Sequence, residues 1–173
     1  PIACADGTRS NLIIQSSIVC QGAQGGILCA DGGHASIHKT QCIDNAAMGL
    51  ELRDNGSASV TDSHFCENGR QGVMSWIGAG MLDMKGCEIF SQQNENGVLI
   101  SEAEASLKKC KIYNNRFGVV AQQKGFVHIS KSKVYGNHEG ILVQDTGSGK
   151  IKQCEVYSNT ANGIFVGMDL KGS

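Results

Sequence analysis

The chain has 173 residues, enough for one domain with a buried core, and its 15 Lys and Arg residues nearly balance 16 Asp and Glu, for a net charge of -1. This balance excludes a global field that would attract nucleic acid or an anionic membrane, and no stretch approaches the ~18 apolar residues of a spanning helix. With 23 Gly, one Pro and 5% aromatic residues, we expect glycine turns, an aliphatic core and a single domain over residues 1–173.

Short alternating segments, each opened by a glycine, recur along the whole chain. They cover residues 26–29, 49–52, 72–75, 97–100, 118–121, 140–143 and 163–166, so their glycines lie 23, 23, 25, 21, 22 and 23 residues apart. A second alternating segment follows each one, and a partial repeat covers residues 2–25. Strands this short cannot bury a core alone, so a period of about 22 residues predicts an all-β solenoid, a parallel β-helix of about seven turns.

Equivalent residues of successive turns would stack into columns about 4.8 Å apart. One inward column contains Ser17, Thr40, Ser63, Cys87, Cys110, Ser132 and Cys154. Because Cys replaces Ser and Thr there, and Cys4, Cys29 and Cys42 also fall on strands, we interpret the eight cysteines as structural thiols rather than disulfides. Two more columns are expected to hydrogen-bond or stack between turns: Asn45, Asn68, Asn115, Asn137 and Asn159, and Phe90, Tyr113, Tyr135 and Tyr157.

Segments 140–147 (GILVQDTG) and 154–159 (CEVYSN) resemble right-handed β-helix repeats nearly residue for residue. Such repeats occur in F-box-only substrate receptors and spindle-associated SHC-binding proteins and, more distantly, in pectate lyases and polysaccharide hydrolases. The resemblance spans essentially the whole chain and implies a right-handed coil. The shared residues are those that build the coil, and the catalytic residues of the lyase and hydrolase members cannot be matched to this sequence residue by residue.

An apolar stripe is expected on one sheet. If the first and third residues after each repeat glycine point inward, the second points outward, which gives Leu28, Glu51, Met74, Leu99, Val120, Leu142 and Phe165. Six of these seven are apolar, and such a stripe suggests a binding face to which Trp76 would add. One alternative is that these residues point inward and their neighbours in the strand point outward. The other is that a further segment covers the stripe.

Lysines concentrate on the later strands of the middle and last repeats. They are Lys85, Lys108, Lys109, Lys111, Lys131, Lys133 and Lys152. Stacked, they predict a basic face suited to a sulfated or uronic glycan or to an acidic protein. Because this face has almost no Arg and no interleaved aromatic residues, we do not expect nucleic acid. A solvated strand face that prevents edge association is the alternative.

Acidic residues lie in or near one column, namely Asp31 above Asp54, with Glu102, Glu104 and Asp145. Asp31, Asp54 and Glu102 are the three acidic candidates for catalysis. Carboxylates in adjacent turns would lie about 5 Å apart, a separation compatible with a retaining glycosidase pair or a calcium site. These carboxylates fall in turns that we expect to be wet, which favours a solvated, non-catalytic role. The five histidines do not share a column, so we predict no metal site and no cofactor.

The sequence therefore favours a non-catalytic recognition or scaffold module that binds a protein or a polysaccharide through a flat face. The alternatives are a carbohydrate-active enzyme, either a polysaccharide lyase or a glycoside hydrolase that uses the three acidic candidates, and an architectural subunit of a large complex. Neither end carries a cap, so we expect further chain or another subunit to cover both. Cysteines of reduced character favour an intracellular setting.

Overall fold

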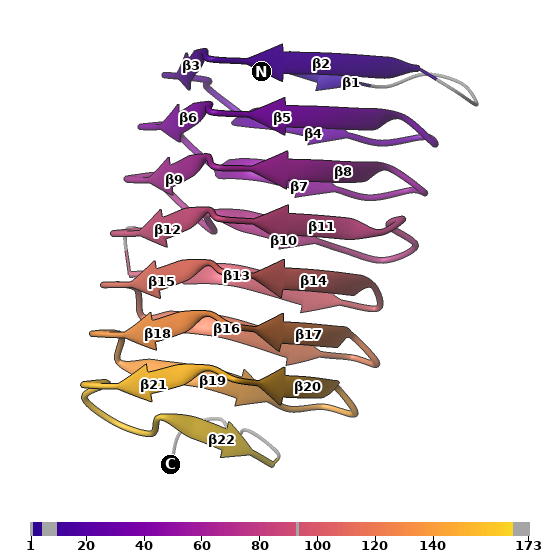
Figure 1. Cartoon of the computed structure of the whole chain (residues 1–173). Helices are drawn as coiled ribbons and strands as arrows, with labels where there is room; N and C mark the ends of the chain where they lie inside the picture. The colour runs from indigo at the N-terminus through magenta and orange to yellow at the C-terminus, as the bar shows by residue number, and fades with distance from the viewer. Residues whose placement is uncertain (1, 5–9, 93, 168–173) are drawn as a thin grey trace.

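Three parallel β-sheets wind around one axis in the computed structural model, which describes residues 2–4, 10–92 and 94–167 (Figure 1). The first sheet contains β1 (Ile2–Cys4), β4 (Gly25–Cys29), β7 (Met48–Leu52), β10 (Val73–Ser75), β13 (Asn96–Ser101), β16 (Phe117–Gln122), β19 (Glu139–Val143) and β22 (Ile164–Val166). The second contains β2 (Asn11–Gln15), β5 (His34–His38), β8 (Ser57–Thr61), β11 (Leu82–Lys85), β14 (Glu104–Lys108), β17 (Phe126–Ser130) and β20 (Ser148–Lys152). The third contains β3 (Ile18–Cys20), β6 (Gln41–Ile43), β9 (His64–Cys66), β12 (Glu88–Phe90), β15 (Lys111–Tyr113), β18 (Lys133–Tyr135) and β21 (Glu155–Tyr157).

Each coil contributes one strand to each sheet, and strands pair with their equivalents one coil before and one coil after. The register is residue for residue, so His34 lies opposite Ser57 and Val60 lies opposite Met84. Figure 1 shows the coils stacked along one axis, with the two termini at opposite ends. The predicted all-β parallel β-helix of about seven turns is confirmed.

Residues that point into the coil form one continuous core. Burial alternates along the strands, as in β8, where Ala58 and Val60 are buried and Ser59 between them is exposed. Small and branched side chains fill the narrow interior because each coil leaves room for only one layer of them. The fully buried members include Ile27, Leu50, Val73, Val98, Val119 and Ile141 of the first sheet and Phe65, Ile89, Ile112 and Val134 of the third.

Sharp corners between the sheets depend on single residues in the left-handed region, which Asn, Asp and Gly tolerate best. The corner after the third sheet places Asp44 (φ 52°) immediately before the buried Asn45. The amide of Asn45 donates to the side-chain oxygen of Asn68 at 2.9 Å, and Asn115 donates to Asn137 at 3.1 Å. The predicted asparagine column is therefore confirmed as a hydrogen-bonded ladder, with Gln92 filling one position.

Two further predicted columns are also confirmed. The rings of Phe90, Tyr113, Tyr135 and Tyr157 stack with centroids 4.9 to 5.0 Å apart and interplanar angles of 3° to 8°. In the inward column of small residues, Thr40, Ser63, Cys87, Cys110 and Ser132 are buried. Cys20, Cys42, Cys66, Cys87, Cys110 and Cys154 are free thiols, and Cys29 is buried, whereas the side chain of Cys4 lies outside the described part of the chain.

We expect Asn137→Ala to destabilise the coil strongly. The Asn137 side-chain amide donates to the carbonyls of Ile112 and Tyr135, and its oxygen accepts from Asn115. Removing it leaves buried polar groups unpaired, which costs about 2–4 kcal/mol of unfolding free energy. Chemical denaturation would measure the loss. Asn162→Ala, which removes an exposed amide, is the control, and equal destabilisation by both variants would contradict the structural role of the ladder.

Alkylation should separate the cysteines by burial. Burial raises the pKa of the Cys42 thiol to about 12, so little reactive thiolate forms at pH 8, whereas Cys20 is exposed. With iodoacetamide at pH 8, mass spectrometry should find Cys20 modified first and Cys42 protected until denaturant is added. Modification of both residues at the same rate in the folded protein would contradict this arrangement.

Candidate functional site

Five exposed lysines gather where the second sheet turns into the third. Lys85, Lys108 and Lys152 end strands β11, β14 and β20, and the strand register places them in one row. Lys109 and Lys131 form the adjacent row, since each is the left-handed residue (φ 56° and 52°) that follows its strand. We call these five residues the lysine surface. Ser130 occupies the position between Lys108 and Lys152 in the first row, and Lys131 supplies the lysine of that coil in the second. Four successive coils, about 4.8 Å apart, therefore each carry at least one lysine of this surface.

Lys111 and Lys133, which the sequence also assigned to the basic face, form ion pairs with glutamates, unlike the five residues of the lysine surface. Lys111 Nζ lies 2.9 Å from Glu88 Oε1, and Lys133 Nζ lies 3.1 Å from Glu155 Oε2. The hydrogen bond from Lys111 lowers the pKa of the Glu88 carboxyl and raises the pKa of Lys111 itself. Within the described residues, no ion pair involves the lysine surface. Its five positive charges are therefore available to an external anion.

The basic charge is confined to the later coils. The row of left-handed corner residues runs through Lys39, Asp62, Gly86, Lys109, Lys131 and Gln153. An acidic residue and a glycine thus separate Lys39 from the two later lysines. This local concentration explains how a chain with a net charge of -1 presents a strongly basic patch.

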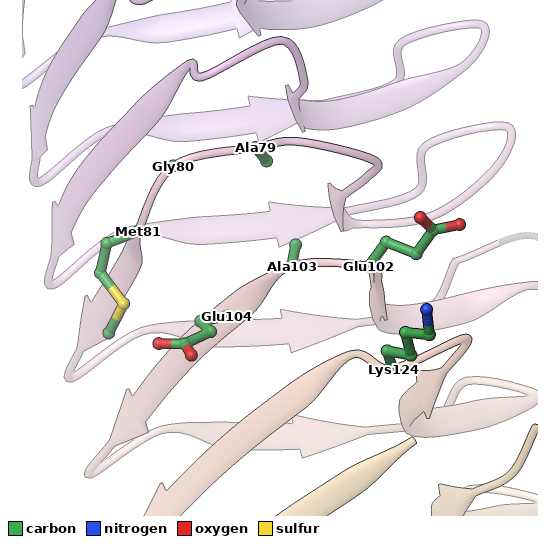
Figure 2. Close-up of a pocket in the computed structure, with 7 residues that line it drawn as sticks. All are labelled: Ala79, Gly80, Met81, Glu102, Ala103, Glu104 and Lys124. Atoms are coloured by element: carbon green, nitrogen blue, oxygen red, sulfur yellow. The ribbon is translucent and has the colours of Figure 1, made fainter. Parts of the chain in front are cut away.

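A hollow of about 460 Å³ lies at the opposite end of the second-sheet strands, where the first sheet connects to the second. Its lining residues, which define the hollow from here on, are Ala79, Gly80, Met81, Glu102, Ala103, Glu104 and Lys124. Figure 2 shows Glu102 and Lys124 on one side, Met81 and Glu104 on the other, and the small side chains of Ala79 and Ala103 between them.

The structure does not bring the three acidic candidates together. Asp31 and Asp54 occupy adjacent coils, as their neighbours Cys29 and Leu52 are paired, and Arg53 Nε lies 3.7 Å from Asp54 Oδ2. Ile77 occupies the next coil, so Glu102 follows two coils after Asp54 and shares the hollow with Glu104 instead. All three candidates are exposed, and the described residues contain no group of three or more His, Cys, Asp or Glu that could hold a metal ion.

The apolar stripe lies apart from the main core but exposes little of itself. Met74, Leu99, Val120 and Leu142 form a separate cluster, and their exposed fractions are only 3% to 7%. Met48, Phe117 and Phe165 pack against this cluster, and the Arg116 guanidinium lies 5.1 Å from the centre of the Phe117 ring. Leu28 and Phe165, at the two ends of the stripe, are half-buried. The stripe therefore packs largely against itself, and its role as a binding face stays a prediction.

Trp76 is the member of the predicted binding face that is most accessible. It lies outside the stripe cluster, on the connection between β10 and β11, and is 42% exposed. Ile77 and Met81 on the same connection are also exposed. The accessible apolar side chains of this region therefore belong to a loop and not to the flat sheet.

Most residues of the hollow were not predicted from the sequence, although the spacing of the repeat glycines indicates a coil of unusual length. The glycines on either side of the connection 76–81 are 25 residues apart, and the next two are 21 apart. A long repeat followed by a short one marks the place where neighbouring connections differ most in length. The spacing does not reveal which of the three corners of the coil receives the additional residues, so the hollow could not be located from it.

Comparison with known proteins agrees with this architecture. A family model described as "Right handed beta helix region" matches residues 49–168. The periplasmic alginate epimerase AlgG is similar in structure with a TM-score of 0.78 at 16% sequence identity, over 86% of this chain and 40% of that one. For pectate lyase Pel9A the TM-score is 0.60 at 18% identity, over 78% of this chain and 42% of that one. For the Azotobacter vinelandii mannuronan C-5 epimerase AlgE6 A-module, the TM-score is 0.58 at 12% sequence identity, over 94% of this chain and 59% of that one.

These similarities establish the fold alone, since all three identities are below 20%. The chain spans about two-fifths of the length of AlgG and of the pectate lyase. No curated protein matches the chain in sequence. The described residues contain no helix with the length and hydropathy needed to cross a bilayer.

Leu99→Glu should destabilise the protein rather than merely alter its surface. Because Leu99 is only 7% exposed, the new carboxylate would be buried in the stripe cluster without a partner, at a cost of about 2–4 kcal/mol of unfolding free energy. Urea unfolding followed by circular dichroism would measure this loss. Ile13→Glu, at a position that is 76% exposed, is the control. Equal stability of the two variants would show that the stripe is accessible to solvent.

Proposed function

The chain belongs to the family of right-handed β-helix regions, and on that premise we propose that it binds acidic polysaccharides through the lysine surface without cleaving them. The observation that carries this proposal is the set of five exposed lysines that lack an ion pair within the described residues. They stand in two adjacent rows along the coil axis.

Periodicity favours a polymer as the ligand. The strand register fixes Lys85, Lys108 and Lys152 in one row and places Lys109 and Lys131 beside it. A polysaccharide of uronic acids carries a carboxylate on each sugar, so lysines on four successive coils can meet several anions of one chain. Each exposed contact contributes at most about 1 kcal/mol, and useful affinity requires that several contacts form together.

The structural neighbours support the same ligand class. AlgG and the AlgE6 A-module are named for epimerisation of alginate and mannuronan, and Pel9A is named for lysis of pectate. All three names refer to acidic polysaccharides. The shared fold therefore occurs in proteins that handle such polymers, which makes a uronic glycan a natural occupant for a basic surface on this coil.

A protein partner is less well supported than a polysaccharide. Protein interfaces depend on a central group of accessible apolar or aromatic side chains. The flat stripe that would supply this group is nearly buried, with Val120 and Leu142 only 3% and 5% exposed. The lysine surface in turn has no Arg, the residue that pairs best with carboxylates and phosphates at specific interfaces. Compact, hydrated ammonium groups suit a loosely held polyanion.

Removing four of these lysines should weaken polyuronate binding by about fourfold or more, since each lost contact costs about 0.2–1 kcal/mol. The variant is Lys108→Gln, Lys109→Asn, Lys131→Asn and Lys152→Gln, in which Asn tolerates the left-handed corner positions. Binding to polymannuronate and polygalacturonate would be measured by affinity electrophoresis and calorimetry at 50 and 300 mM salt, with weaker binding at the higher salt.

Lys39→Asn is the matched control, because it removes one charge from the same corner row three coils before Lys109. The control should bind like the wild type. Equal binding by the quadruple variant would overturn the proposal, and tighter binding of double-stranded DNA than of either polyuronate would assign the surface to nucleic acid. Loss of polymer length, new unsaturated ends or epimerised sugars, with or without calcium, would show an enzyme in place of a binding module.

A further inference from the structure

The hollow arises from a mismatch between neighbouring connections. Between the paired positions Ser75–Ile100 and Leu82–Ala105, the β10–β11 coil has six residues (76–81), whereas the next coil has only four (101–104). The longer connection extends beyond the shorter one, and Gly80 N donates to Gly56 O, which ties its end to the preceding coil. A recess therefore forms beneath residues 76–81, above the connection 123–125 that carries Lys124.

The shape of the hollow suits a small ring. The hollow is open to solvent, and its volume of about 460 Å³ leaves room for one small ring. Ala79, Gly80 and Ala103 provide a surface without long side chains, and Figure 2 places polar groups on both sides of it, with Glu102 and Lys124 on one side and Glu104 on the other. A ring resting on the small residues would meet hydrogen-bonding groups at both edges.

The chemistry of these groups selects among possible rings. Carboxylates only accept hydrogen bonds, and an ammonium group only donates them. A sugar hydroxyl does both, so a hydroxyl-rich ring can pair with Glu102, Glu104 and Lys124 at once. A uronic acid would bring a third carboxylate next to the two glutamates. The hollow thus favours a neutral ring, whereas the lysine surface favours an acidic one.

Accessible apolar side chains lie on the connection and strand next to the hollow. Trp76 and Ile77 lie on the connection above it, and Met81 lines it. Phe126, also exposed, lies opposite Glu104 in the register of β14 and β17. The C–H faces of sugar rings pack against such surfaces, and aromatic side chains offer both area and rigidity. These four side chains bring apolar area to the same edge of the coil as the polar groups of the hollow.

We propose that the hollow binds a neutral pyranose ring of an oligosaccharide. Glu102 and Glu104 accept hydrogen bonds from its hydroxyls, Lys124 donates one, and Trp76 or Phe126 packs against an adjoining ring. The site is separate from the lysine surface, because β14 begins with Glu104 at the hollow and ends with Lys108 at the lysine surface. It does not depend on the proposed binding of acidic polysaccharides.

Trp76, the only tryptophan of the chain, provides a direct signal. Neutral oligosaccharides of glucose, mannose and xylose would be titrated into the full chain, with change in tryptophan fluorescence and calorimetric heat as the two measurements. Oligouronates and oligoglucosamines would serve as the charged comparisons. We expect at least one neutral series to bind and to change the fluorescence, and the lysine-surface variant should bind that series as the wild type does.

Glu104→Ala and, independently, Lys124→Asn should each weaken binding of the neutral oligosaccharide about tenfold. Asp83→Ala is the matched control, since Asp83 is an exposed carboxylate on β11 of the same sheet but outside the hollow. The proposal is overturned if no neutral series binds, if oligoglucosamine binds and neutral sugars do not, or if Asp83→Ala weakens binding as much as Glu104→Ala. If the protein binds neutral oligosaccharides but not polyuronates, the site in the hollow stands and the proposed binding of acidic polysaccharides is rejected.

Discussion

Backbone pairing between successive coils is the constraint on which the rest of the molecule depends. Each strand finds its hydrogen-bond partners one coil away in residue-for-residue register, so every side chain faces the equivalent side chain of its neighbours at about 4.8 Å. An inward position must then be apolar or small in nearly every coil. A buried polar position must pair with its own kind, as the amides of Asn45 and Asn68 do.

The same constraint explains why the sequence predicts so much of the fold. A column occupied by asparagine or tyrosine at a fixed period can be identified before any coordinates are known, because the repeat itself carries the register. The stack of Tyr113 on Tyr135 and the pairing of Asn115 with Asn137 both follow from positions 22 residues apart. Gln92 fits the asparagine ladder because its longer side chain reaches the same carbonyl row.

Features that depend on how coils differ were harder to predict. Alternation predicts an outward stripe, but it gives no measure of how far Leu99 and Val120 cover one another, and both are nearly buried. The regular repeat likewise placed Asp54 and Glu102 in or near one column, but it did not show that they lie two coils apart. Ile77 occupies the equivalent position in the coil between them. The hollow depends on a difference of two residues between two connections, and the total repeat length does not assign these residues to any corner.

Function in such a coil therefore lies in the departures from the repeat. The inward positions of β8 and β14 are nearly interchangeable, with Ala58 and Val60 in one and Ala105 and Leu107 in the other. Their outward positions are not, because β8 carries Ser and Thr where β14 carries Glu104 and Lys108. A strand of five residues spans about 16 Å, so one end of β14 can be acidic and the other basic without direct neutralisation at short range. A uniform scaffold thereby holds a hollow lined by Glu102, Glu104 and Lys124 and a surface of lysines at opposite ends of the same strand.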